Sequence, residues 1–211
     1  MTSRTKGAFS LLETMRLEGG RLVRRDRHLA RAAGAAAAFG YAWDTAATAV
    51  ALDGAETAHP DGVWRARLLV SADGTSAVEC SAHAHDGGRA WRVALADRGV
   101  DSSDVFLRHK TTRRDVYERA RAARPDLDDV LLWNERGEIT ESTIANVVIE
   151  VDGARDTPPA SCGLLPGVFR GALLDTGEIG ERVLTKEDLA AAKRVWLINS
   201  LREWIQAVLV T

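Results

Sequence analysis

The sequence predicts an α+β fold with largely antiparallel sheets, divided into two lobes. Expected strands and helices are mixed without a regular strand–helix–strand repeat, and several expected strand pairs are joined by short glycine turns. A stretch containing glycine and serine interrupts this order near residue 100. Such mixing is typical of α+β rather than parallel α/β folds. We expect an N-terminal lobe over residues 1–98, a linker at 99–108 and a C-terminal lobe over 109–211.

Turn residues separate the elements expected in the N-terminal half. Gly19-Gly20 allows the positive φ angles of a hairpin, and Ala72-Asp73-Gly74 is a second hairpin turn. Asp26 is suited to cap a helix that Gly40 would end. We therefore expect strands at 9–17, 21–25, 64–70, 76–85 and 91–96, and helices at 27–39 and 44–52.

Capping patterns organise the C-terminal half. Thr112 followed by Asp115 resembles a capping box, which predicts a helix from about 112 to 123, before Pro125. Thr185 begins a similar run for a short helix, and Pro166-Gly167 introduces a helix to about residue 175. The expected strands lie at 130–133, 138–151, 194–198 and 204–210.

The composition excludes several classes of function. The 211 residues are 45% hydrophobic and 27% charged, as in ordinary soluble globular proteins, and the net charge of −2 gives no bulk attraction to nucleic acid. No apolar run approaches the roughly 20 residues of a membrane span, and residues 1–6 lack the apolar stretch of a signal peptide. Cys80 and Cys162 have no metal-type spacing. We expect a cytoplasmic protein with free thiols and without a metal.

Three segments contain residues suited to one kind of chemistry. Lys110 lies in the run His109-Lys110-Thr111-Thr112, Glu141 follows on an apolar strand, and Pro166-Gly167 opens a helix. An amine, a carboxylate and an anion-binding helix start are the groups needed to hold pyridoxal phosphate. Their order resembles that of the fold-type IV pyridoxal-phosphate enzymes, also called class IV aminotransferases. The run around Lys110 is most similar to that of the aminodeoxychorismate lyases.

The resemblance implies a two-lobed fold and a role for each matching residue. Lys110 corresponds to the Schiff-base lysine, and Glu141 would accept a hydrogen bond from the ring nitrogen and keep it protonated. The cofactor-binding residues implied in this way are Arg31, Lys110, Glu141, Asn146, Val168, Phe169 and Ser200. Arg31 and Ser200 would contact the phosphate together with the backbone amides of 168 and 169, and Asn146 would brace the glutamate or its loop.

Two local arguments accompany these assignments. A helix beginning near Thr112 would favour the neutral, nucleophilic form of Lys110. Strict strand alternation places residues 141 and 146 on opposite faces, so their cooperation requires a bulge or a strand end between them. A tyrosine that meets the cofactor in some aminotransferases has no clear counterpart, because Tyr117 is a poor positional match.

The substrate-binding residues are predicted from one strand face and one loop. Leu12, Thr14 and Arg16 share a face because strand side chains alternate. The resemblance implies that this face lines the substrate pocket, and that an arginine there binds a substrate carboxylate. The predicted set is Thr14, Arg16, Arg65 and Leu201.

The resemblance implies a homodimer that converts a small molecule, 4-amino-4-deoxychorismate, to 4-aminobenzoate and pyruvate. The main alternative is an aminotransferase acting on a branched-chain or D-amino acid, which would use the same cofactor residues. A cofactor-binding protein without catalysis and a purely structural α+β domain are the remaining alternatives. Taken alone, Lys110 would be read as a solvated lysine in a basic run, so the combination of segments carries the assignment.

Overall fold

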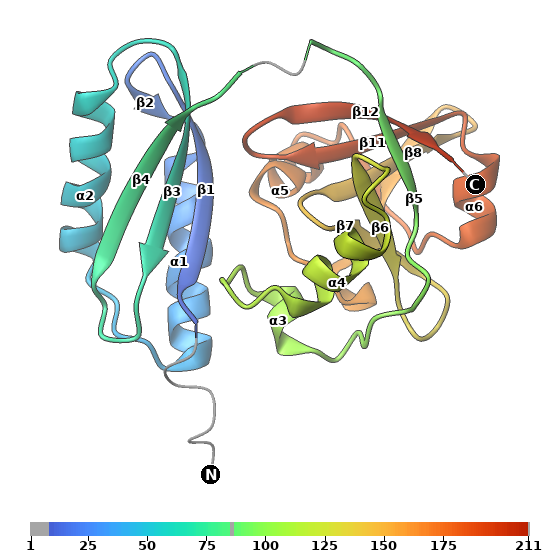
Figure 1. The fold of residues 1–211 in the computed structure, drawn as a ribbon, viewed down its shortest axis with the longest axis horizontal. Coiled ribbons are helices and arrows are strands. Elements are labelled where there is room, and N and C mark those ends of the chain that lie inside the picture. The colour runs from blue at the N-terminus through green and yellow to red at the C-terminus, as the bar shows by residue number, and fades with distance from the viewer. Residues whose placement is uncertain (1–8, 85–86, 211) are drawn as a thin grey trace. The chain divides into compact units, whose positions relative to one another are not determined.

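The computed structural model describes residues 9–84 and 87–210. These residues form two compact units: residues 9–84 with His109–Arg113, and residues 87–108 with 114–210. Figure 1 shows the elements of the first unit, which are β1 (Leu11–Glu18), β2 (Arg21–Leu22), α1 (Arg25–Phe39), α2 (Thr45–Ala58), β3 (Val63–Val70) and β4 (Ser76–Ala82).

The first unit is a four-stranded antiparallel sheet in the order β2-β1-β3-β4, with both helices on one face. Register places Met15 opposite Ala66, and both side chains are fully buried on the helix-covered face. A hydrogen bond of 2.8 Å between Thr48 Oγ1 and Ser76 Oγ ties α2 to β4 on the same face. The alternation of β1 and β3 therefore leaves the other side chains of these strands on the opposite face.

The lysine segment packs with the first unit. The amide of Leu12 donates to the carbonyl of Lys110 at 3.0 Å, and the amide of Thr112 donates to the carbonyl of Ser10 at 2.9 Å. These bonds attach residues 110–112 to the edge of β1 because that edge has unpaired backbone groups. This division of the chain differs from the expected one, in which a linker at 99–108 precedes a C-terminal lobe starting at 109.

The second unit contains a mixed sheet in the order β10-β9-β8-β11-β12-β5-β6-β7. An additional β7–β8 pairing closes β8, β11, β12, β5, β6 and β7 into a ring around fully buried residues such as Val93, Leu131, Val147 and Leu197. Its elements are β5 (Trp91–Leu95), α3 (Val105–Arg108), α4 (Asp115–Ala123), β6 (Asp129–Trp133), β7 (Ile139–Ser142), β8 (Asn146–Val151), β9 (Ala154–Thr157), a 3₁₀ turn (Ala160–Cys162), α5 (Val168–Asp175), β10 (Gly180–Glu181), α6 (Lys186–Ala191), β11 (Arg194–Asn199) and β12 (Glu203–Leu209).

The α+β class and most elements agree with the sequence predictions. Helix α5 begins directly after Pro166-Gly167, and Thr185 caps α6 in a capping box with Asp188. The predicted start of α1 is wrong: its N-cap is Arg24, with a positive φ of 58°, and Asp26 lies in the first turn. Strand β4 ends at Ala82, and residue 85 of its predicted range lies outside the described residues.

Three further differences concern the region around the predicted site. Strand β5 pairs in parallel with β12 and β6 and so belongs to the second unit. The predicted linker contains α3 and the buried Val100. The predicted strand 138–151 is two strands, β7 and β8, joined by a tight turn. No helix in the described ranges is long and apolar enough to cross a bilayer.

Candidate active site

A buried group of three polar side chains joins β1 to α1 in the first unit. His28 Nδ1 lies 2.7 Å from Glu13 Oε2, and both side chains are almost inaccessible to solvent. Arg31, one helical turn after His28, donates to Glu13 through Nε at 2.9 Å and Nη2 at 2.6 Å. Glu13 lies on the helix-covered face of the sheet because it alternates with Thr14 along β1. Of these three residues, the sequence motifs predicted only Arg31; Glu13 and His28 were not predicted.

The charges of this group are strongly coupled. Burial would raise the pKa of Glu13, but the positive charge of Arg31 and hydrogen bonds from His28 and Arg31 outweigh it and hold the pKa at about 2. Burial lowers the pKa of His28 despite its contact with Glu13. We therefore describe the group at neutral pH as an ionised glutamate, a charged arginine and a neutral histidine.

The charge of Lys110 acts on the same group of side chains. Its positive charge is one of the causes that lower the pKa of His28, along with burial and Arg31. The first unit thus brings the predicted Schiff-base lysine near the helix that carries the predicted phosphate arginine. The expected helix start beside Lys110 is absent: α4 begins at Asp115, and the hydroxyl of Thr112 accepts from the amide of Ser10. The predicted effect of this helix on the protonation of Lys110 therefore stays a prediction.

Glu141 and Asn146 face each other in the second unit. They are directly paired across the antiparallel β7–β8 ladder, on either side of a turn in which Ser142 N donates to Ala145 O at 2.7 Å. The chain reverses between them, so both side chains lie on one face. This is the strand end that the sequence analysis required for their cooperation.

Several donors converge on the buried carboxylate of Glu141. Tyr117 Oη donates to Oε1 at 2.7 Å, the amide of Leu165 donates to the same oxygen at 3.1 Å, and Asn146 Nδ2 donates to Oε2 at 3.3 Å. Glu141, Asn146 and Tyr117 are all buried. Hydrogen bonds from these donors stabilise the charged form of a buried carboxylate, which burial alone would disfavour.

Asn146 also connects the glutamate to the turn before α5. Its Nδ2 donates to the carbonyl of Leu165 at 2.8 Å. A Cβ atom added to Gly167 would overlap Asn146 Oδ1, so the close approach of this turn requires glycine. The Pro166-Gly167 turn is therefore matched to the asparagine, which the sequence alone did not indicate.

Helix α5 begins where an anion could be bound. Gly167, its N-cap, has extended backbone angles and provides no side-chain cap for the first amides. The Phe169 ring packs edge-on against Trp204 at 6.2 Å, within an apolar cluster that includes Ile198 of β11. The Phe169 side chain is thus occupied by packing, and the role predicted for the backbone amides at 168 and 169 stays a prediction. The buried Ser200 follows β11 directly.

The predicted substrate arginines share the sheet face that lies opposite α1 and α2. Arg16 is paired with Arg65 across β1 and β3, and Thr14 is paired with Arg67. Arg16 donates to Glu18 through Nε at 2.8 Å and Nη2 at 3.1 Å. Among the described residues, Arg65 has no acceptor within hydrogen-bonding distance. Leu201, the fourth predicted residue, is in the second unit, where its amide donates to Asn199 Oδ1 at 3.1 Å.

Comparison with protein families assigns the chain to a family. Residues 10–210 match the model of the family described as amino-transferase class IV. The chain belongs to this family. The resemblance inferred from the Lys110, Glu141 and Gly167 segments is thereby confirmed, as are the two-lobed fold class and the assignment to an enzyme family.

Relatives within the class IV family carry two kinds of name. A solved structure from Mesorhizobium loti, described as a "Putative amino-acid aminotransferase", is 41% identical with a TM-score of 0.90, over 96% of this chain and 100% of that one. A "Putative aminodeoxychorismate lyase" from Schizosaccharomyces pombe is 38% identical over 109 residues, 48% of this chain and 47% of the relative. A "Putative branched-chain-amino-acid aminotransferase" from Methanocaldococcus jannaschii is 25% identical over 56% of this chain and 43% of the relative. The matches span less than half the length of these two curated relatives.

The described side chains fit the cofactor that membership of this family implies. Pyridoxal phosphate requires an amine, an acceptor for its ring nitrogen and an anion site. The first unit offers Lys110 as the amine and Arg31 as a candidate for the phosphate. The second unit offers the donor-surrounded Glu141 as the acceptor and the start of α5 as a candidate anion site. Tyr117 was missed as part of this set, because its position relative to Glu141 depends on packing between α4 and β7.

Proposed function

We propose that this class IV enzyme binds pyridoxal phosphate and cleaves 4-amino-4-deoxychorismate to 4-aminobenzoate and pyruvate, a step toward folate. Lys110 would form the imine with the cofactor, Glu141 would contact the ring nitrogen, and Arg31, the amides at 168 and 169 and Ser200 would hold the phosphate. We further propose a cytoplasmic homodimer, in line with the family resemblance.

The observation that carries the cofactor assignment is the environment of Glu141. A carboxylate 4% exposed that accepts hydrogen bonds from Tyr117, Leu165 and Asn146 is an acceptor held in one orientation. A protonated pyridine nitrogen is the partner that such an acceptor suits. When bound, the cofactor supplies an electron sink for the substrate carbon that bears the amine.

The chain's own groups would carry out the proton transfers. The free amine of Lys110 would act as the base that removes a proton from the carbon bearing the substrate amine. Glu141 would keep the ring nitrogen of the cofactor protonated, which is the form that best accepts electrons. The ether bond that joins the enolpyruvyl group to the substrate would break, and the substrate ring would become aromatic. The released enolpyruvate would take up a proton to become pyruvate. Lys110 would also assist the release of 4-aminobenzoate.

Arg65 is the best-placed of the predicted arginines for a substrate carboxylate. Arg16 is already neutralised by the bidentate contact with Glu18, whose carboxylate has a lowered pKa because of hydrogen bonds from Arg16. Arg67 lies 3.4 Å from Glu79. Arg65 lies on the same sheet face, next to Arg16 in register, and makes neither of these ion pairs. We propose that Arg65 binds a substrate carboxylate, with Thr14 and the Leu201 loop lining the substrate pocket.

The alternative function is amino transfer to a keto acid from a branched-chain or D-amino acid. The 41% identity to the Mesorhizobium loti structure favours it, whereas the match to the Schizosaccharomyces pombe protein favours the lyase. The cofactor residues are common to both reactions, so a product measurement must separate them.

The test is the stoichiometry of products without a keto acid. A lyase leaves the cofactor as its aldehyde and needs no acceptor, whereas a transaminase passes through the pyridoxamine form. We expect equal amounts of pyruvate and 4-aminobenzoate from 4-amino-4-deoxychorismate, and little spectral change with leucine, D-alanine or glutamate. Rapid conversion to the pyridoxamine form with one of these amino acids, without release of 4-aminobenzoate, would establish the aminotransferase instead.

A further inference from the structure

The hydroxyl of Tyr117 points directly at the carboxylate proposed to hold the cofactor ring. We propose that Tyr117 is a positioning residue that fixes Glu141 and keeps the shared proton on the ring nitrogen rather than on the carboxylate. This inference rests on the proposed cofactor, and it holds equally for a lyase and for a transaminase. It adds a residue that the family resemblance did not supply.

Geometry supports a fixed contact. Tyr117 Oη lies 2.7 Å from Glu141 Oε1, and the two side chains are 8% and 4% exposed. The Tyr117 ring of α4 is held in an apolar cluster with Leu107 and Leu132. The guanidinium of Arg114, the N-cap of α4, lies 4.8 Å from the centroid of that ring. The ring therefore has little freedom to rotate the hydroxyl away from the carboxylate.

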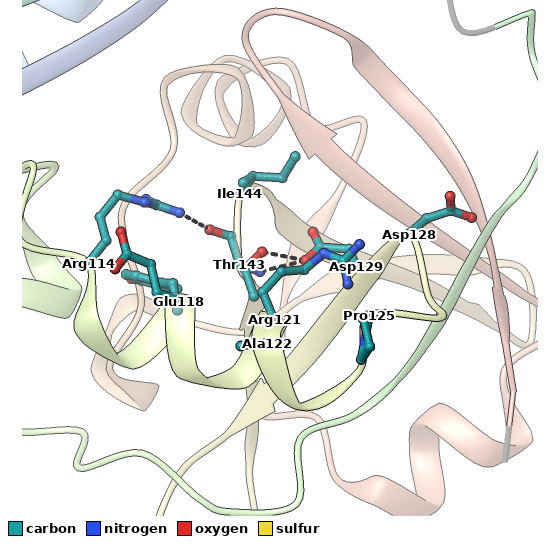
Figure 2. A pocket seen from close by; sticks show the side chains of 10 residues that line it. Arg114, Glu118, Arg121, Ala122, Pro125, Asp128, Asp129, Thr143 and Ile144 are labelled. Carbon is teal, nitrogen blue, oxygen red and sulfur yellow. Dashed lines mark hydrogen bonds between the residues drawn. The ribbon is translucent and has the colours of Figure 1, made fainter.

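The turn after Glu141 is held by the same helix. Figure 2 shows Arg114 Nη2 bonded to the carbonyl of Thr143, a contact of 2.6 Å, and Thr143 bonded to the buried Asp129. These residues line a surface pocket of about 530 Å³ beside α4. Tyr117 thus fixes the side chain of Glu141, and Arg114 fixes the backbone two residues later. Helix α4 and its N-cap therefore hold the Glu141 carboxylate and the turn after it in place.

Hydrogen-bond donors change where the shared proton resides. Each donor to a carboxylate lowers its affinity for a proton, so a glutamate with several donors leaves the proton on a nearby pyridine nitrogen. Burial first, and then the negative charge of Glu141, raise the pKa of Tyr117 well above its ordinary value. The phenol consequently stays protonated, and remains a donor, throughout the pH range in which enzymes work. Loss of the hydroxyl would make Glu141 more basic and less well oriented.

The experiment compares two tyrosine-to-phenylalanine variants of the full chain. Tyr117→Phe removes the donor to Glu141, whereas Tyr41→Phe removes a buried hydroxyl that donates to the Phe9 carbonyl at the same distance of 2.7 Å. Each protein is loaded with pyridoxal phosphate labelled with ¹⁵N in the ring, and the ¹⁵N chemical shift is followed with pH. This shift distinguishes a protonated from a neutral ring nitrogen without reference to turnover.

We expect the wild type and Tyr41→Phe to keep a protonated ring nitrogen over the whole range. Tyr117→Phe should be displaced toward the neutral shift throughout this range, because the more basic carboxylate takes a larger share of the proton, and its kcat should fall about tenfold, the loss expected for one hydrogen bond to a charged group. In a Glu141→Gln background, Tyr117→Phe should have little further effect on kcat, because the acceptor is gone. Folding of each variant is checked by its circular dichroism spectrum.

Three results would overturn the inference: an unchanged ¹⁵N profile in folded Tyr117→Phe, an equal change in Tyr41→Phe, or full additivity with Glu141→Gln. Failure of wild-type protein to bind the labelled cofactor would overturn it as well. Absence of 4-aminobenzoate would refute only the lyase reaction, since the ring-nitrogen measurement does not depend on the substrate.

Discussion

Glu13 accepts hydrogen bonds from two nitrogen atoms of the Arg31 guanidinium, Nε at 2.9 Å and Nη2 at 2.6 Å. This planar contact fixes the orientation of an arginine that is only 14% exposed. The proposed phosphate arginine is thus oriented from within its own unit, before any ligand binds. His28 supports the same carboxylate from the neighbouring turn of α1.

Arg31→Ala should weaken binding of pyridoxal phosphate with a smaller effect on turnover at saturating cofactor. A charge-assisted hydrogen bond contributes about 1.5–3 kcal/mol, so the affinity should fall by about tenfold or more. Fluorescence titration of the apoprotein measures this. Arg27→Ala, which changes an exposed arginine one turn earlier in α1, is the control and should bind normally. Unaltered affinity in Arg31→Ala would mean that another residue binds the phosphate.

Glu13 should make the first unit sensitive to acid. Its pKa is about 2 in the folded protein and 4.5 in its ordinary state, so the unfolded chain binds more protons between these values. The stabilisation is complete above about pH 4.5 and is lost as pH falls toward 2. Denaturant unfolding from pH 2 to 7 should show a flatter profile for Glu13→Gln than for the wild type. Glu79→Gln, at an exposed ion pair, should keep the wild-type profile; an equally steep Glu13→Gln curve would contradict the assignment.

Glu141→Gln should retain the cofactor but react far more slowly. The amide cannot hold the ring nitrogen protonated, and loss of one such electrostatic contact lowers kcat by about 10²–10³. Steady-state kinetics at saturating cofactor measures the effect. Glu150→Gln alters a second carboxylate of the same ring of strands, 9% exposed, and should leave kcat near normal. A wild-type rate in Glu141→Gln would show that the glutamate is structural.

Gly167→Ala should impair cofactor binding through Asn146. The new Cβ atom would overlap Asn146 Oδ1, and displacement of that side chain would break its bonds to Glu141 and the Leu165 carbonyl. Equilibrium dialysis should show weaker binding together with a lower melting temperature. Gly54→Ala is the control: this helical glycine has open space at its Cβ, and alanine there should stabilise by about 0.5–1 kcal/mol. Normal cofactor binding by Gly167→Ala would show that Asn146 does not contribute to the cofactor site.

A sequence pattern predicted the start of a helix correctly where both hydrogen-bond partners lie within that helix. Thr185 and Asp188 form the predicted capping box because both of its bonds close within α6. Thr112 and Asp115 show the same pattern, but the Thr112 hydroxyl accepts from the amide of Ser10, a residue distant in sequence. A tertiary contact therefore displaced the helix start that the pattern predicts.

The same difference between local and tertiary contacts applies to the candidate site. The motifs located Lys110, Glu141 and Gly167, and the pairing of Glu141 with Asn146 met the condition that alternation imposed. Glu13 and Tyr117 were missed, because their roles depend on which faces of α1 and α4 meet the strands. A carboxylate at a core-facing position of β1 was the available signal for Glu13, since buried carboxylates require partners.

The most direct test of the account is the covalent link between pyridoxal phosphate and Lys110. Purified protein loaded with cofactor is reduced with borohydride, digested and mapped by mass spectrometry, with Lys110→Ala and Lys186→Ala treated in parallel. We expect the visible absorbance of the imine to disappear on reduction, the adduct to map to Lys110, and neither adduct nor turnover in Lys110→Ala, whereas Lys186→Ala should behave as the wild type. An adduct on another lysine, or substantial turnover by Lys110→Ala, would contradict the central claim.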